Sequence, residues 1–297
     1  MLQNTKLLNG LITGDLKSLA RTLTVVENNL AGADDILKSL VFRETPVIGI
    51  TGPPGAGKST LVNALLGLVA AKNKVAILAV DPTSPFNKGS LLGDRIRMSE
   101  HFINKNVFIR SIGTRGSLGG LSAKTIEMVD VLRASNFDYI FVETVGVGQS
   151  EVEVAGLADL SIVVLVPQSG DEIQSIKSGL MEIADLFVVN KADREGADEF
   201  INQLKKMTND KTYKIPVIAT VASKGENITS VLDFIKKQNT LNTNKNKAYL
   251  LSEKAWHLIQ NERMAGIKKE KLQQDIAEAL KLADFNLYQF IEKFKHS

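Results

Sequence analysis

The sequence of 297 residues predicts a three-layer α/β fold with a mostly parallel sheet, and two observations predict it. Short apolar runs recur along the middle of the chain, and stretches with helical spacing of apolar residues separate them. Most runs are unbroken rather than alternating, which is typical of parallel strands covered by helices on both faces. The runs are 47–51, 75–80, 107–111, 139–143, 162–166, 186–189 and 217–220.

Residues 1–43 predict a helical extension that precedes the sheet. Apolar residues recur there at helical spacing, and no strand pattern occurs. Asp15 and Asp34 stand where N-caps would begin successive helices, and Gly10, Gly14 and Gly32 are expected to punctuate them.

The first apolar run ends in a glycine-rich segment, Gly52-Pro53-Pro54-Gly55-Ala56-Gly57-Lys58-Ser59, and an amphipathic stretch follows it. A strand, a turn that exposes backbone N–H groups and a helix N-terminus together bind polyphosphate, so residues 44–237 are predicted to be a P-loop NTPase domain. Lys58 is expected to reach the β- and γ-phosphates, and Ser59 to bind Mg²⁺. The predicted nucleotide contacts here are Gly52, Gly55, Ala56, Gly57, Lys58, Ser59 and Thr60.

A second motif, Asn190-Lys191-Ala192-Asp193, directly follows the run 186–189 and predicts the base. Guanine presents two adjacent donors that Asp193 can accept, whereas adenine would leave the carboxylate unpaired, so GTP and GDP are the expected ligands. Asn190 is expected to tie this loop to the P-loop, and the stem of Lys191 to cover one face of the base. A backbone N–H at Ala222, after the run 217–220, is placed to meet guanine O6.

Three carboxylates follow strands where Mg²⁺ would lie: Asp81, Asp94 and Glu143. Mg²⁺ takes one or two carboxylates together with phosphate oxygens, so these three and Ser59 are the predicted metal residues. A carboxylate at a strand end can also merely cap a turn, and that alternative stays open.

Glu143-Thr144-Val145-Gly146 occupies the place of the Asp-x-x-Gly element of GTPases. Gly146 can donate its backbone N–H to the γ-phosphate, and Gln149 can orient the attacking water, although a loop glutamine is often only solvated. The predicted catalytic residues are Lys58, Glu143 and Gln149. The arginines considered for steadying transition-state charge are Arg95, Arg97, Arg110 and Arg115.

Composition excludes several classes of protein. The net charge of +3 is too small to predict nucleic-acid binding, and the absence of cysteine excludes disulfides and thiolate metal sites. No apolar run approaches the roughly 18–20 residues that span a bilayer, so no membrane association is expected. The start MLQNTKLLNG lacks the pattern of a secretory signal, which predicts a cytoplasmic location.

The C-terminal part begins with a polar linker at residues 238–247. Residues 248–297 then show helical periodicity with many large apolar side chains, which need a surface to cover them. That surface is either the core of the same chain or a second copy, in which case this part is a helical dimerisation arm.

Several segments together resemble the methylmalonyl-CoA mutase-associated GTPase (MeaB) family, also called ArgK or LAO/AO transport ATPase. The resemblance covers nearly the whole chain. The segments that carry it are 52–59, 80–85, 89–94, 114–120, 142–151 and 170–179.

The resemblance implies a GTP hydrolase that is slow without its partner and serves as a chaperone of an adenosylcobalamin-dependent acyl-CoA mutase, gating cofactor delivery and protecting the mutase. By position, Asp81, Asp94 and Glu143 would belong to the Mg²⁺ and switch apparatus. Segment 168–177 would contact the mutase, and the C-terminal helices would form a homodimer.

Two other classes share the P-loop architecture. A nickel-delivery GTPase needs a His/Cys cluster, and this chain has no cysteine and three scattered histidines. A small-molecule kinase needs an acceptor pocket and has no need of the guanine specificity that Asp193 predicts.

Overall fold

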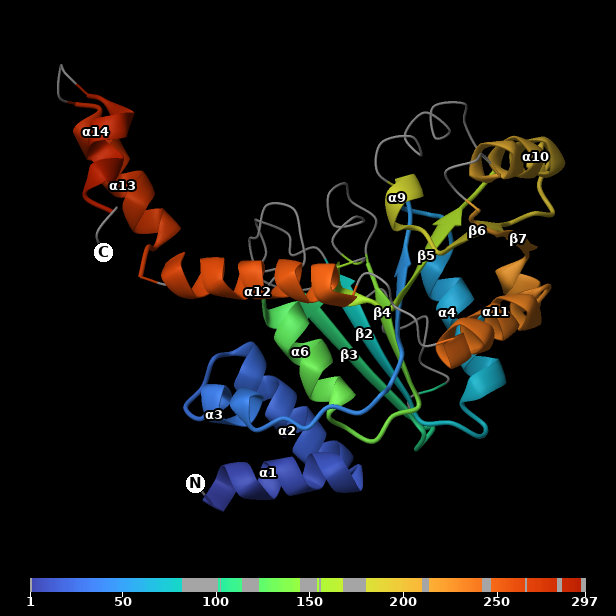
Figure 1. The fold of residues 1–297 in the computed structure, drawn as a ribbon, viewed down its shortest axis with the longest axis horizontal. Coiled ribbons are helices and arrows are strands. Elements are labelled where there is room, and N and C mark those ends of the chain that lie inside the picture. Colours follow the sequence, from blue (N-terminus) through green and yellow to red (C-terminus); the bar gives the residue numbers. More distant parts are fainter. Residues whose placement is uncertain are drawn as a thin grey trace. The chain divides into compact units, whose positions relative to one another are not determined.

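The computed structural model describes residues 2–81, 101, 103–113, 123–144, 154, 156–167, 180–209, 214–241, 247–264, 266–281 and 285–294. Its centre is a seven-stranded sheet in the order β3-β2-β4-β1-β5-β6-β7, and every neighbouring pair is parallel (Figure 1). The predicted α/β fold is confirmed. The strands are β1 (Val47–Thr51), β2 (Val75–Asp81), β3 (Val107–Gly113), β4 (Tyr139–Glu143), β5 (Leu160–Leu165), β6 (Leu186–Asn190) and β7 (Val217–Thr220).

Helices cover both faces of this sheet, as unbroken apolar strands require. One face packs against α4 (Lys58–Val69) and α11 (Ile228–Leu241) in a single core that includes Phe141, which is fully buried. The other face is covered in two halves (Figure 1). Over β2, β4 and β1 lie α1 (Leu2–Thr13), α2 (Leu16–Glu27), α3 (Ala33–Lys38) and α6 (Ala123–Arg133), and over β5 and β6 lie α9 (Met181–Ile183) and α10 (Ala197–Thr208).

The N-terminal helices confirm one predicted cap and correct another. Asp15 caps α2, because its carboxylate accepts the backbone N–H groups of Lys17 and Ser18. The prediction for Asp34 was wrong: Gly32, in the left-handed conformation with φ 89°, is the N-cap of α3, and Asp34 lies in its first turn. The positive φ favours glycine there, and a Cβ at this position would lie 2.6 Å from the Asn4 side-chain amide of α1.

Gly10 does not end a helix as predicted, because α1 continues to Thr13. A Cβ at this position would lie 2.3 Å from the Ser18 side chain. The glycine therefore serves the close packing of α1 on α2, whereas Gly14, with φ 79°, is the residue at which the chain turns.

Three aspartates join the amino ends of neighbouring strands. Asp138, Asp159 and Asp185 each stand one residue before a strand, and each accepts a backbone N–H at the start of the adjacent strand. The distances are 2.7 Å to the Lys74 nitrogen, 2.9 Å to the Val47 nitrogen and 2.7 Å to the Ser161 nitrogen. These bonds fix the register at the amino ends of the strands. They thereby also align the carboxyl ends, where the site lies.

The C-terminal residues form a compact unit of their own, residues 255–297, apart from residues 1–254. The helices of this region are α12 (Lys247–Met264), α13 (Lys269–Ala279) and α14 (Leu287–Glu292). Neither α13 nor α14 has a buried residue among those described, and Trp256 and Tyr288 are 60% and 78% exposed. Within the described ranges no helix is both long and apolar enough to cross a bilayer.

An ion pair fixes the N-terminal helices to the edge strand β3. The Arg110 guanidinium of β3 lies 2.5 Å from the Glu27 carboxylate of α2, and both side chains are largely buried. Arg110 was one of the arginines considered for a catalytic role, and its partner gives it a structural one instead.

Replacing Arg110 by methionine should lower the free energy of unfolding by about 1–3 kcal/mol, because the largely buried Glu27 carboxylate loses this cationic partner. Urea denaturation measures the change. Arg21→Met, at an exposed position of α2, is the matched control and should change stability by less than about 0.5 kcal/mol. Equal effects of the two substitutions would contradict a structural role for the Arg110 pair.

Candidate nucleotide-binding site

The segment 52–59 leaves β1, turns sharply and enters α4 at Lys58. Its turn depends on glycine: Gly52 has φ 134°, and a Cβ there would lie 2.0 Å from the Val164 carbonyl oxygen. Gly57 has φ 86°, and a Cβ there would lie 2.3 Å from the Asn190 amide nitrogen. The backbone is thus folded into a concave turn at the positive end of the helix dipole, which is the geometry that binds phosphate.

Lys58 lies inside this turn and is only 7% exposed. Its ammonium donates to the carbonyl oxygens of Gly52 at 2.8 Å and Pro53 at 3.0 Å. A buried ammonium is stable only with such partners, and a phosphate oxygen would be a stronger one because it carries charge. The side chain is therefore held beside the place where a bound phosphate would lie.

Ser59 and Glu143 meet at the carboxyl ends of β1 and β4. The parallel register sets Glu143 opposite Ile50, and the Ser59 hydroxyl donates to the Glu143 carboxylate at 2.6 Å. Both side chains are about 5% exposed. A hydroxyl and a carboxylate are the oxygen donors that Mg²⁺ prefers, so these residues fit the predicted metal role.

A second buried pair lies directly behind this one. The Thr144 hydroxyl donates to the Thr51 hydroxyl at 2.9 Å, and the Thr144 backbone N–H donates to the Ile50 carbonyl at 3.0 Å. These bonds hold the residue after Glu143 against the strand that carries the P-loop. The motif analysis did not single out either threonine, since nothing in their spacing joins them.

Asn190 joins three segments of the site. Its side-chain amide donates to the Ala56 carbonyl at 2.9 Å, and its side-chain oxygen accepts the Ala222 N–H at 3.0 Å and the Thr220 hydroxyl at 3.3 Å. The predicted tie between this loop and the P-loop is thus present as a buried hydrogen bond.

The next residues of the loop face the same region. The Lys191 ammonium donates to the Gly55 carbonyl at 2.7 Å, and Lys191 has a positive φ of 57°. The Asp193 carboxylate accepts from the Lys224 ammonium at 2.9 Å. This contact lowers the pKa of the Asp193 carboxyl from its ordinary value, so Asp193 is an ionised acceptor.

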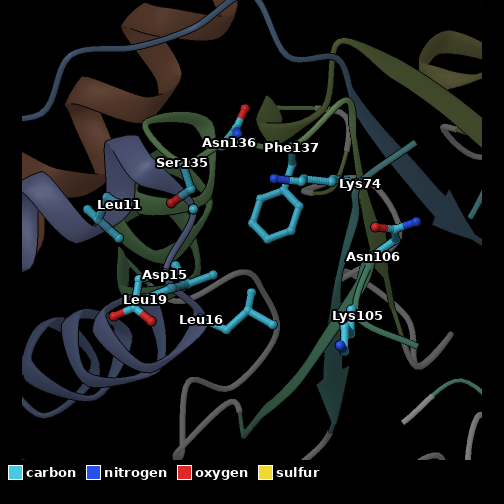
Figure 2. A pocket seen from close by; sticks show the side chains of 11 residues that line it. Leu11, Asp15, Leu16, Leu19, Lys74, Lys105, Asn106, Ser135, Asn136 and Phe137 are labelled. Atoms are coloured by element: carbon cyan, nitrogen blue, oxygen red, sulfur yellow. The ribbon is translucent and has the colours of Figure 1, made fainter. Parts of the chain in front are cut away.

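Two cavities differ in their relation to these residues. A groove of about 270 Å³ between α4 and the turn 222–225 is bordered by Thr60 and Ala222, two of the predicted nucleotide contacts. A pocket of about 40 Å³ lies at the amino ends of the strands, where Leu16 and Phe137 face the same space (Figure 2). Ligands of parallel sheets bind at the carboxyl ends of the strands, whereas this pocket lies at the amino ends and holds at most a few waters. The pocket is therefore no part of the nucleotide site.

The remaining predicted residues are placed as follows. Asp81 is the last residue of β2. Asp94, Gly146 and Gln149 lie outside the described residues, as do Arg95, Arg97, Arg115 and the whole of segment 168–177. Like Thr51 and Thr144, Lys224 makes a contact that the motif analysis did not predict, and its signal in the sequence is its place two residues after Ala222.

Comparisons with known proteins agree with this geometry. The family model described as methylmalonyl-CoA mutase-associated GTPase MeaB matches residues 19–278. A protein of Pyrococcus horikoshii named as a GTPase is 43% identical over 92% of this chain and 89% of its own length. The mouse protein named methylmalonic aciduria type A homolog, mitochondrial, is 34% identical over 78% of this chain and 62% of its own length.

A solved structure described as a LAO/AO transport system kinase has the same fold. Its TM-score is 0.68, with 24% sequence identity over 99% of this chain and 97% of that one.

Gly52→Ala should lower the free energy of unfolding of the nucleotide-free protein by about 3 kcal/mol or more, because the new Cβ meets a backbone carbonyl that cannot move aside. Gly55→Ala is the matched control, because Gly55 also has a positive φ of 77° but no neighbouring atom lies within 4 Å of its Cβ position. Only backbone strain of roughly 1–2 kcal/mol is therefore expected for this variant. Thermal and urea unfolding measure both. Similar losses in the two variants would show that close packing on Val164 does not shape the turn.

Proposed function

The chain belongs to the methylmalonyl-CoA mutase-associated GTPase family. From this premise we propose that it is a Mg²⁺-dependent GTPase. We propose further that it acts as a chaperone of an adenosylcobalamin-dependent acyl-CoA mutase, namely methylmalonyl-CoA mutase. GTP hydrolase activity itself follows from the family and from relatives named as GTPases. The observation that carries the nucleotide role is the buried Asn190 bridge, which joins the phosphate-binding turn to the base-binding loop.

At the phosphate end, the backbone N–H groups of the turn and the Lys58 ammonium would bind the β- and γ-phosphates. Lys58 would exchange its carbonyl partners for phosphate oxygens, which costs little because the ammonium is already desolvated. Ser59 and Glu143 would hold Mg²⁺, whose charge neutralises the phosphate oxygens during transfer. Asp81, Asp94, Gly146 and Gln149 complete the proposed set from sequence alone.

At the base end, Asp193 would accept the two adjacent donors of guanine while Lys191 covers one face of the ring. The Ala222 N–H, which was predicted to meet guanine O6, donates to the Asn190 side chain in the structure instead, and this bond fixes the turn in position. An adenine in the same place would leave the Asp193 charge without its donors, which costs a few kcal/mol.

The mutase role rests on the family description and on the mouse relative, whose name refers to methylmalonic aciduria. In this proposal the P-loop domain uses GTP to control when the cofactor passes to the mutase and to protect the mutase from inactivation. Hydrolysis is proposed to be slow in the chain alone and to accelerate when the mutase binds.

We also propose a homodimer through the C-terminal helices. Large apolar side chains there are exposed within their own unit, among them Trp256, Leu280 and Tyr288. A second copy offers the same apolar surface, which suits a symmetric interface.

The two alternative functions have less support. A nickel-delivery GTPase needs a metal-presenting cluster, and in the described part of the chain no three His, Asp or Glu side chains form one. A small-molecule kinase would gain nothing from the ionised Asp193 beside the base-binding turn.

Asp193→Asn should weaken GDP binding roughly 10- to 100-fold and improve binding of xanthosine diphosphate. The amide keeps one acceptor for the ring N1–H but turns a donor toward the guanine amine, whereas xanthine has an acceptor there. Calorimetry with both nucleotides measures this change of nucleotide preference, and Asp34→Asn on α3 is the control. Unchanged GDP affinity would remove Asp193 from base recognition.

The purified chain should co-elute with methylmalonyl-CoA mutase to an extent that depends on whether GDP or a non-hydrolysable GTP analogue is present. Linkage requires that the mutase change nucleotide affinity by the same factor. Single-turnover GTP hydrolysis with and without the mutase measures acceleration, and Lys58→Ala should lose the nucleotide dependence. No co-elution with either nucleotide, together with an unchanged hydrolysis rate, would refute the chaperone proposal.

A further inference from the structure

The ion pair between Asp193 and Lys224 connects two loops that follow different strands. Its oxygen and nitrogen are 2.9 Å apart, and the two side chains are 41% and 56% exposed. A pair so open to water contributes little to stability. Its significance therefore lies in what it does to the Asp193 carboxylate rather than in holding the fold.

The backbones on both sides of this pair are already fixed. The Ala192 N–H donates to the Thr220 carbonyl, and the Arg194 N–H donates to the Lys191 carbonyl, so the backbone on either side of Asp193 is bonded. In the facing turn, the Lys224 N–H donates to the Val221 carbonyl, and the chain then reverses at Gly225. The remaining freedom is the rotation of the Asp193 side chain, which the Lys224 ammonium restricts.

We propose that Lys224 is a positioning residue that determines guanine specificity: it holds the Asp193 carboxylate in the orientation that accepts both guanine donors. This inference rests on the proposed role of Asp193 in base recognition. A carboxylate offers about four lone-pair sites, so one bond to Lys224 through Oδ2 leaves enough acceptors for the ring N1–H and the exocyclic amine.

The pair also keeps Asp193 ionised. The hydrogen bond from Lys224 is the largest cause that lowers the pKa of Asp193, and Arg194 on the same loop acts in the same direction. Glu226, on the far side of the turn, is the acidic neighbour that raises the pKa of Lys224 together with Asp193 itself. Acid should therefore weaken GDP binding at a lower pH in the wild type than in a variant without the Lys224 charge.

A competing arrangement predicts the opposite. If Lys224 occupied an acceptor site that guanine needs, it would have to leave before the base could bind. Its removal would then tighten GDP binding, whereas removal of a positioning residue weakens it.

The test uses the full chain with three substitutions. Lys224→Met removes the charge and keeps the stem, Lys224→Arg keeps the charge, and Lys72→Met changes an exposed lysine beyond the far end of α4. Affinities for GDP and inosine diphosphate are measured by calorimetry, because inosine lacks only the exocyclic amine. Lys224→Met should weaken GDP binding roughly three- to tenfold and inosine diphosphate binding less, so the preference for GDP falls, while the other two variants keep it.

GDP affinity is also measured as a function of pH. The pH below which acid weakens GDP binding should be higher in Lys224→Met than in the wild type, and it should stay unchanged in the other two variants. Tighter GDP binding, or equal losses for the two nucleotides, would overturn the positioning role. If Asp193→Asn weakens GDP binding but Lys224→Met does not, only this inference fails. If neither substitution has an effect, the proposed base site itself is wrong.

Discussion

The buried amide of Asn190 is the contact on which the site depends. It is 3% exposed, and its two ends bond to the P-loop at Ala56 and to the turn at Ala222. Its nitrogen lies so near Gly57 that no side chain fits there. Removing the amide would leave buried backbone groups unpaired at a cost of about 1–3 kcal/mol each. The Lys191 ammonium, which donates to the Gly55 carbonyl, is a second and exposed link between the same two loops.

The Asn190 bridge forms only if the carboxyl ends of β1, β6 and β7 lie level with one another, so that the loops after them come within hydrogen-bond distance. The parallel register provides the alignment, and aspartates such as Asp138 and Asp159 fix it at the opposite edge. The Ser59–Glu143 contact near the phosphate end is buried, whereas the base end relies on the exposed Asp193.

The sequence by itself determined the strands, because a buried parallel strand is an apolar run whatever it packs against. It also determined the glycine turn 52–59 and the Asp15 cap, since each depends on residues within a few positions. Local reading was wrong where a neighbour in space decided the outcome. Gly10 continues a helix where α2 packs closely on it, and Asp34 lies in the first turn of α3 because Gly32, with its positive φ, takes the N-cap position.

Only the tertiary structure decided which polar groups meet. The partner of Arg110 is 83 residues away, Thr51 and Thr144 are 93 residues apart, and Asp193 and Lys224 are 31 apart. No periodicity encodes such pairs, because each depends on the order of strands in the sheet and on which face a side chain takes. The motifs predicted that a guanine nucleotide site exists, and the fold determined which side chains hold it in shape.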